Sequence, residues 1–134
     1  MVAHILNLEL RLFPMELFKL ICQLAIGIGI LNVWLVRFNV QTRYRGGSAT
    51  NMKDEFSIYG LPEKLVWVAG TIKIGTAIAL LAGIAFPSLI TPAATVLAVF
   101  MLSAVLFHVK VKDPLFKSIP ATTVLLLTLV LLLF

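Results

Sequence analysis

Lys73, Asn32 and His108 lie inside apolar runs of this 134-residue chain, and each has a side chain that can bind a ligand or a proton. Lys73 carries an ammonium, Asn32 an amide and His108 an imidazole. A lysine inside a membrane costs about 2.5–3.5 kcal/mol on insertion scales, so it forms an ion pair, snorkels to the interface or serves a site. All three roles remain open for Lys73, the most informative residue in the sequence.

The positions of these residues along the predicted helices place them in one half of the molecule. With a helix rise of about 1.5 Å per residue, Asn32, Lys73 and His108 all fall on the side of the two basic loops. We therefore expect a polar cavity that opens toward these loops, in which Asp113 or Glu55 supplies the charge opposite Lys73. The candidate ligand-binding residues are Asn32, Glu55, Lys73, Thr76, His108 and Asp113.

The sequence offers no set of residues for self-sufficient catalysis. His108 has no second histidine on a facing span, which argues against a bis-histidine haem, and Cys22 is the single cysteine. No Ser/His/Asp set, zinc constellation or P-loop is recognisable, and Gly27-Ile28-Gly29 lies inside an apolar helix. We predict no catalytic residue, no metal site and no nucleic-acid partner, and a quinone or a lipid is the class of cofactor to consider.

Composition indicates the medium that surrounds these residues. Hydrophobic residues make up 60% of the chain and charged residues only 13%, and the mean hydropathy is +1.05. A soluble domain has about a quarter of its residues charged, so a water-soluble globule is excluded. The lipid bilayer is therefore the first predicted partner.

The predicted fold class is all-α, a polytopic membrane protein built as an antiparallel bundle of four transmembrane helices. A span requires roughly 20 mostly apolar residues, and the chain contains four such runs. We expect residues 1–134 to form a single membrane domain. The helices are predicted at about residues 14–37, 62–86, 91–109 and 118–134.

Prolines and small polar residues predict where these helices begin. Pro14 is expected in the first turn of the first helix, where its missing N–H costs nothing. Thr91-Pro92 predicts an N-cap followed by proline at the start of the third helix. Residues 1–13 either lie at the membrane interface or extend the first helix.

The polar segment 38–61 is predicted to be a structured loop with a short amphipathic helix. Asn51 is a favourable N-cap, and Met52, Phe56 and Tyr59 form an apolar stripe at positions i, i+4 and i+7. We expect this stripe to lie against the bundle or the lipid headgroups.

The distribution of Lys and Arg predicts the orientation in the membrane. The side that carries the 38–61 and 110–117 loops has eight of these residues, counted out to the helix ends, and the opposite side has two. Basic residues favour the cytoplasmic side. We therefore expect both loops to be cytoplasmic and both termini to lie outside.

Small residues recur at spacing four on three of the predicted helices. Gly75, Ala79 and Gly83 form such a stripe on the second, Ala25 and Gly29 on the first, and Ala94 and Ala98 on the third. Such stripes let membrane helices approach closely, so packing between helices is their expected role.

Motifs in three stretches of the chain form a recognisable pattern. They are Arg45-Gly46-Gly47 with Glu55-Phe56 in the loop, Tyr59-Gly60-Leu61-Pro62 with Gly70 and Lys73 in the second helix, and Val105-Leu106-Phe107-His108, Asp113-Pro114-Leu115 and Lys117-Ser118-Ile119-Pro120-Ala121 at the last junction. These stretches resemble DoxX-like membrane proteins. The resemblance covers about residues 30 to 125 and implies a four-helix membrane bundle. The broader family includes subunits associated with thiosulfate:quinone oxidation, a redox-associated complex and the receptor-assembly chaperone NACHO, so the resemblance implies no single activity.

Three functions agree with these observations. The first is an accessory or assembly protein without chemistry of its own, which binds other membrane proteins or a second copy of itself. The second is a quinone- or lipid-binding subunit of a membrane redox complex. The third, a proton or small-solute pathway, is disfavoured because the outer half of the bundle has few polar residues. We favour the first.

Overall fold

The computed structural model describes residues 1–134 and contains only helices, which confirms the predicted all-α bundle. Four of its segments are long and apolar enough to cross a membrane. The short helix predicted in the first loop is also present. In chain order the elements are α1 (Val2–Leu31), the π-helical segment η1 (Asn32–Val36), α2 (Met52–Ile58), α3 (Glu63–Ala82), the 3-10 segment η2 (Pro87–Leu89), α4 (Ile90–Lys110), the 3-10 segment η3 (Leu115–Ser118) and α5 (Ile119–Leu133).

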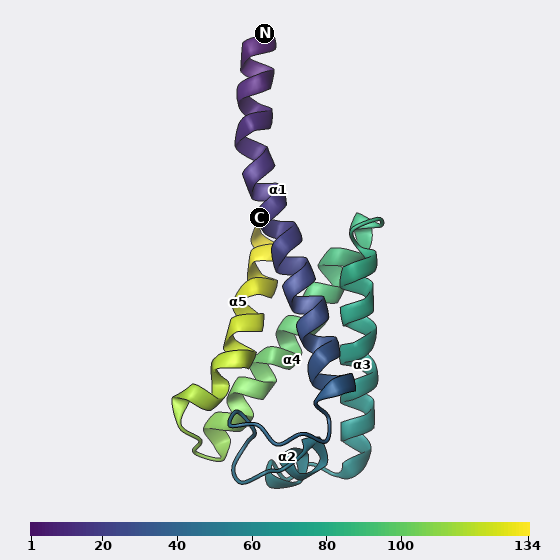
Figure 1. The fold of residues 1–134 in the computed structure, drawn as a ribbon, viewed down its shortest axis with the longest axis vertical. Coiled ribbons are helices and arrows are strands. Elements are labelled where there is room, and N and C mark those ends of the chain that lie inside the picture. Colours follow the sequence, from purple (N-terminus) through teal and green to yellow (C-terminus); the bar gives the residue numbers. More distant parts are fainter.

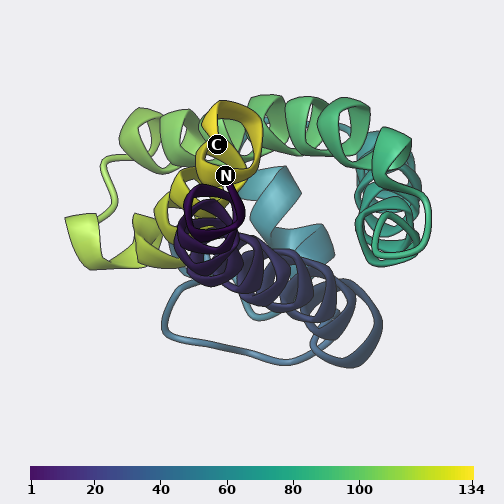
Figure 2. The same cartoon turned by 90° about the horizontal axis from the view of Figure 1, so that it is seen from above.

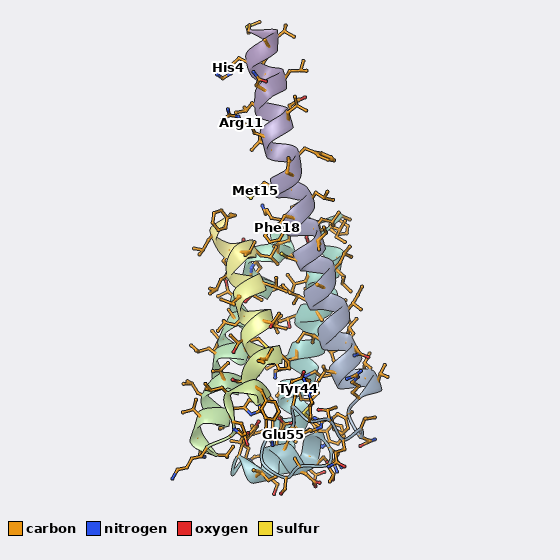
Figure 3. The ribbon with its side chains drawn as sticks, turned by 60° about the vertical axis from the view of Figure 1, so that its left-hand side comes forward. His4, Arg11, Met15, Phe18, Tyr44 and Glu55 are labelled. Carbon is orange, nitrogen blue, oxygen red and sulfur yellow. The ribbon has the colours of Figure 1, made fainter.

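The four long helices form a closed arrangement in the order α1, α3, α4, α5, with α5 returning to α1 (Figures 1 and 2). Successive long helices run antiparallel. We call the end of the bundle that carries α2, the 37–51 loop and the 111–118 connection the basic end. Toward the basic end α1 and α5 separate, whereas near the C-terminus they lie close together (Figures 1 and 3).

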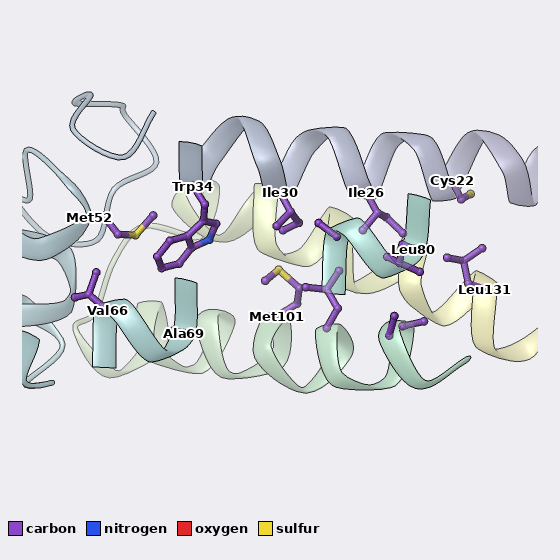
Figure 4. Close-up of a cluster of buried hydrophobic side chains, with 14 residues drawn as sticks. Cys22, Ile26, Ile30, Trp34, Met52, Val66, Ala69, Leu80, Met101 and Leu131 are labelled. Carbon is purple, nitrogen blue, oxygen red and sulfur yellow. The ribbon is translucent and has the colours of Figure 1, made fainter. Parts of the chain in front are cut away.

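The core follows one stripe of α1. Cys22, Ile26, Ile30 and Trp34 are spaced four residues apart and are all buried, facing α3, α4 and α5 (Figure 4). Lipid is as apolar as these side chains, so close packing and interhelical hydrogen bonds must hold the helices together. Near the end opposite the basic end, the Gln23 side-chain amide donates a hydrogen bond to a backbone carbonyl of α3.

Two glycines allow α1 and α3 to approach closely, Gly83 of a predicted stripe and Gly27 outside the stripes. A Cβ added to Gly83 would lie 3.1 Å from the Gln23 amide nitrogen of α1, and a Cβ added to Gly27 would lie 2.6 Å from the Leu81 side chain, which would have to shift. Ala25 and Gly75, which belong to the predicted small-residue stripes, are exposed, and a Cβ on Gly75 would meet nothing within 4 Å. The predicted packing role is therefore wrong for Ala25 and Gly75.

The first helix begins earlier than predicted. Helix α1 runs from Val2 through Pro14 without a break, so Pro14 is not in the first turn. A proline removes only one backbone hydrogen bond, and the surrounding leucines continue the helix. Residues 1–17 are exposed on every side, and this part of α1 projects beyond the ends of the other helices (Figures 1 and 3). Of the two alternatives for residues 1–13, extension of the helix is the one observed.

The turn between α3 and α4 also differs from the prediction. Helix α3 ends at Ala82 instead of residue 86, and α4 begins at Ile90, so Thr91 is not an N-cap. The 3-10 segment that starts at Pro87 already turns the chain back. Pro92 then lies in the first turn of α4, where its missing N–H leaves no carbonyl unpaired.

The loop helix α2 forms as its sequence predicts. The Asn51 side chain accepts a hydrogen bond of 2.9 Å from the Asp54 N–H and so caps the helix. Met52 and Tyr59 are buried, and the Phe56 ring meets Trp34 edge-on with 6.1 Å between centroids. This stripe attaches the loop to the bundle and positions Glu55 at its basic end (Figure 3).

Candidate functional site

A cavity of about 480 Å³ lies at the basic end of the bundle, where α1, η1, α3, α4 and α5 surround it and the loop and α2 complete its wall. Its volume lies within the range of small-molecule sites, about 300–1,000 Å³. Its lining residues are Gly29, Ile30, Asn32, Val33, Trp34, Arg37, Thr42, Tyr44, Arg45, Met52, Glu55, Lys73, Met101, Ala104, His108, Lys117, Pro120, Ala121, Thr123 and Val124.

Arg45 fastens the loop that forms one wall of the cavity. Its guanidinium is buried and donates to the backbone carbonyls of Arg37 at 2.6 Å, Phe38 at 3.3 Å and Val40 at 3.1 Å. The same group forms a 2.9 Å ion pair with Glu55 of α2. The planar fork of arginine can hold several acceptors at once, which a lysine ammonium cannot do in the same geometry. Arg45 therefore joins the loop backbone to α2.

Glu55 connects Arg45 to the next polar side chain. Its second carboxylate oxygen accepts from the Gly46 N–H at 3.1 Å and from the Tyr59 hydroxyl at 2.9 Å. Burial, reinforced by the negative charge of Glu55, raises the pKa of Tyr59 well above its usual value, so Tyr59 stays a neutral donor. A Cβ on Gly46 would lie 2.5 Å from the Tyr59 hydroxyl, so the loop can approach this ring only with glycine there.

His108 and Asp113 continue the polar network on α4. His108 Nε2 lies 3.5 Å from the Tyr59 hydroxyl, and His108 Nδ1 lies 2.7 Å from the Asp113 carboxylate. The other oxygen of Asp113 accepts a hydrogen bond of 3.0 Å from the Gly47 N–H. The Lys117 ammonium lies 3.8 Å from this same oxygen. The network thus connects the loop, α2, α4 and the start of α5.

A left-handed residue at the end of α4 brings Asp113 back to His108. Lys112 has φ = +58°, and the N–H groups of Lys112 and Asp113 return to the carbonyls of Val109 and His108, both at 3.0 Å. These two bonds form the Schellman motif that ends many helices, normally with glycine at the left-handed position. The turn is thus strained at Lys112.

Replacing Lys112 with glycine is expected to stabilise the protein by about 0.5–1 kcal/mol. Glycine removes the cost of about 1–2 kcal/mol that a left-handed backbone imposes on an L-residue, and the entropy that it adds to the unfolded chain offsets part of this gain. Thermal unfolding in detergent measures this change. A lower unfolding midpoint for Lys112→Gly would contradict it.

Acid is expected to weaken the Asp113 connection. Burial opposes ionisation of Asp113, but the hydrogen bonds from His108 and Gly47 outweigh it and hold the pKa of Asp113 below its usual value. A lowered folded-state pKa stabilises the protein above the unfolded pKa of about 3.9 and loses this contribution as pH falls through the folded pKa. The unfolding midpoint should therefore fall on acidification below about pH 4.

The control for this pH dependence is Asp113→Asn, measured by thermal unfolding between about pH 2 and pH 6. This variant should lose less stability over the interval than the wild type. Some loss should remain, because hydrogen bonds from Thr50 also lower the pKa of Asp54. Identical acid profiles for the variant and the wild type would contradict the role given to Asp113.

Lys73 forms no direct ion pair with Asp113 or Glu55, the two carboxylates expected opposite it, although the negative charge of Glu55 acts on it from a longer distance. Glu55 is paired with Arg45, and Asp113 with His108 and Lys117. The Lys73 ammonium instead lies over two aromatic rings, 5.2 Å from the centroid of Trp34 and 5.6 Å from that of Phe100. Glu55 pairs with Arg45 instead of Lys73 because the Arg45 guanidinium also donates hydrogen bonds to the loop carbonyls.

Four of the six predicted candidates line the cavity, namely Asn32, Glu55, Lys73 and His108. Thr76 is not a lining residue, and its hydroxyl donates to the Lys73 carbonyl at 2.9 Å within α3. Asp113 is hydrogen-bonded to His108 and to the Gly47 N–H of the loop. Thr76 and Asp113 therefore lie outside the cavity wall.

Several residues of the site were not among the predicted candidates. Arg45 and Tyr59 carry the network, and Arg37 and Lys117 add positive charge to the cavity wall. A signal for three of them existed, since Arg45, Tyr59 and Lys117 all occur in the motifs that resemble DoxX-like proteins. Arg37 carried no such signal.

The arrangement is suited to binding. No group of three His, Cys, Asp or Glu side chains that could hold a metal ion occurs in the structure. The cavity wall combines apolar side chains with a few polar groups, which is the usual composition of small-molecule sites.

The comparisons identify the family. The model of the DoxX-like family matches residues 44–132, which is more than half of the chain. The chain therefore belongs to the DoxX-like family, as the sequence motifs predicted, and is a multi-pass membrane protein. No curated protein and no solved structure matches it significantly.

Proposed function

We propose that this chain is an integral membrane accessory protein that holds a small amphiphile in the cavity at its basic end and has no chemistry of its own. The observation that carries this proposal is Lys73, whose ammonium borders the cavity with no carboxylate within 4.0 Å and no hydrogen-bond partner in the protein. Asn32 also lines the cavity with its side-chain amide free of protein hydrogen bonds. Polar groups inside a membrane protein that lack partners usually serve a ligand.

The local backbone supports this role. Asn32 begins the π-helical segment η1, where the Arg37 N–H bonds to the Asn32 carbonyl at 2.9 Å. Such π turns inside helices occur frequently at functional sites. The segment contributes both the amide of Asn32 and the ring of Trp34 to the cavity wall.

The packing of the half of the bundle away from the basic end favours ligand binding over transport across the membrane. Cys22, Ile26, Leu80, Leu97 and Leu131 are buried there and fill the space between the four helices. A proton or solute pathway needs polar groups or water along its whole length. The cavity is therefore proposed to be closed toward that half.

Cavity filling tests the proposal. A Cβ on Gly29 would meet nothing within 4 Å, and Gly29 lines the cavity, so Gly29→Leu should occupy ligand space without disturbing the fold. Gly75→Leu is the matched control, because Gly75 has equal space but lies outside the cavity. Native mass spectrometry after gentle extraction should find a bound small molecule on the wild type and on Gly75→Leu, reduced at least tenfold on Gly29→Leu. Absence of a bound molecule from all three proteins would refute the proposal.

We further propose that the basic end faces the cytoplasm, from the eight-to-two distribution of Lys and Arg. On a Cys22→Ser background, Ser48→Cys should react with a membrane-impermeant thiol reagent only after the membrane is opened. A reporter fused after Phe134 should lie outside. The reverse result at both positions would invert the orientation.

A second candidate function is the binding of a partner protein by the projecting part of α1. Residues 1–17 are exposed, and large apolar side chains such as Leu6, Leu10 and Phe13 are at least half exposed. Because this part of α1 projects beyond the other helices of the chain, these side chains are available to a helix of another protein (Figure 1). A photoreactive residue at Leu6 should form an adduct with another protein or a second copy of the chain, and exclusive reaction with lipid would refute this candidate.

A further inference from the structure

The charges around the cavity do not balance. Its wall contains the cations Arg37, Arg45, Lys73 and Lys117, and Glu55 is its one carboxylate. Glu55 is committed to Arg45, and Lys117 has a carboxylate, Asp113, 3.8 Å away behind the wall. Arg37 and Lys73 have no carboxylate within 4.0 Å. Arg37 is exposed, and the negative charge of Glu55 acts on Lys73 only from beyond ion-pair distance. Lys73 is therefore a cation of the cavity wall that no protein anion contacts directly.

The aromatic rings near Lys73 offset only part of the cost of placing a cation there. A cation–π contact contributes about 0.5–2 kcal/mol, depending on how dry the site is. The cost of a lysine in a membrane is about 2.5–3.5 kcal/mol on insertion scales. An oxyanion that enters the cavity can approach Lys73 and also accept a hydrogen bond from the Asn32 amide, whereas a neutral head group gains no ion pair.

The wall of the cavity between α1 and α5 is suited to an apolar chain. It is formed by Ile30 and Val33 on one side and by Ala121 and Val124 on the other, with Gly29 leaving open space between them. The wall includes residues that are exposed on the outside of the bundle, Val33 among them. Because α1 and α5 separate toward the basic end (Figures 1 and 3), this side of the cavity is the one at which an apolar chain would leave the bundle.

On this basis we propose that the ligand is an amphiphile with an oxyanion head, a carboxylate or a phosphate, that pairs with Lys73 while its apolar chain passes between α1 and α5 into the surrounding leaflet. This inference rests on the proposed function and specifies the ligand class of the same cavity. A free fatty acid and an anionic phospholipid share this chemistry, and the experiment below separates them.

Quenching of Trp34 fluorescence tests the proposal, because Trp34 lines the cavity and is only 6% exposed, so bulk lipid reaches it poorly. The second tryptophan, Trp67, is half exposed and is replaced by phenylalanine, which can keep the stacking on Phe38. The protein is placed in nanodiscs of unbrominated phosphatidylcholine. Three brominated probes are then added one at a time: dibromostearate, dibrominated phosphatidylglycerol and the neutral dibromostearyl alcohol.

The wild-type cavity should bind one or both anionic probes at least tenfold more tightly than the alcohol. Quenching by dibromostearate identifies a free carboxylate, and quenching by brominated phosphatidylglycerol alone identifies a lipid phosphate. Lys73→Met should remove this preference, Lys73→Arg should keep it, and Lys53→Met, which changes a lysine outside the cavity wall, should not affect it.

The experiment can refute the oxyanion head and the binding of an amphiphile separately. Equal quenching by the alcohol and the anionic probes in the wild type refutes the oxyanion head but leaves an amphiphile site in place. This comparison needs no change at Lys73, so it remains valid even if Lys73→Met does not fold. Quenching by no probe beyond the level seen in Gly29→Leu refutes the binding of these amphiphiles, and with an absence of co-purified ligand it refutes the proposed function.

Discussion

Replacing Arg45 with methionine is expected to lower the free energy of unfolding by about 3–5 kcal/mol, the usual cost of removing one partner of a buried ion pair. The variant leaves the Glu55 carboxylate buried with only neutral donors. It also leaves the loop carbonyls of Arg37, Phe38 and Val40 without the donors that Arg45 provides. Thermal unfolding in detergent, followed by circular dichroism, measures the loss.

Two controls separate this effect from a general loss of charge. Arg43 lies two positions earlier and is exposed, with its contacts confined to the neighbouring Tyr44, so Arg43→Met should change stability by less than about 0.5 kcal/mol. The double variant Arg45→Met/Glu55→Met should recover part of the loss, because no unpaired carboxylate remains. Equal losses in Arg43→Met and Arg45→Met would refute the structural role of Arg45.

Replacing Phe56 with aspartate is expected to lower the free energy of unfolding by about 2–4 kcal/mol, because it places a carboxylate among apolar side chains. Phe56 packs against the core and meets the Trp34 ring edge-on. The loop helix should then detach from the bundle, and the cavity should lose the part of its wall formed by Met52 and Glu55. Expression level and thermal unfolding should both fall.

The neighbouring position provides the matched control. Ser57 is exposed on the same turn of α2, so Ser57→Asp introduces the same charge in contact with water and should leave stability within about 0.5 kcal/mol of the wild type. Wild-type stability in Phe56→Asp would mean that α2 does not depend on the bundle.

The helices and the loop helix were predictable because their signals are local. Long apolar runs indicate the four spans, and the Asn51 cap with its apolar stripe indicates α2. The start of α1 was predicted incorrectly because Pro14 is a weak local signal that neighbouring residues overcome. The turn before α4 was missed because Pro87 already reverses the chain.

The candidate site was predictable in part for a related reason. Depth along a helix follows from residue number, so Asn32, Lys73 and His108 were correctly expected at one end of the bundle. Which carboxylate meets which cation depends on contacts between residues far apart in the sequence. Arg45 competes for Glu55 with several acceptors at once, an advantage that residue spacing does not reveal.

The role of Arg45 also bears on the cavity itself. Arg45, Thr42 and Tyr44 form the part of the cavity wall that belongs to the loop, and the network of Glu55 and Tyr59 holds that loop in place. Variants that loosen the network should therefore weaken ligand binding as well as stability. Variants of Lys73 should weaken binding with a smaller effect on stability.

A structure determined in nanodiscs of native lipid would show directly whether the cavity holds an amphiphile. We expect elongated density in the cavity, with one end within hydrogen-bond distance of the Lys73 ammonium and the Asn32 amide and the other end between α1 and α5. Density of that shape should be absent from Gly29→Leu and present in Gly75→Leu. A wild-type cavity occupied only by water, or closed by its own side chains, would contradict the account.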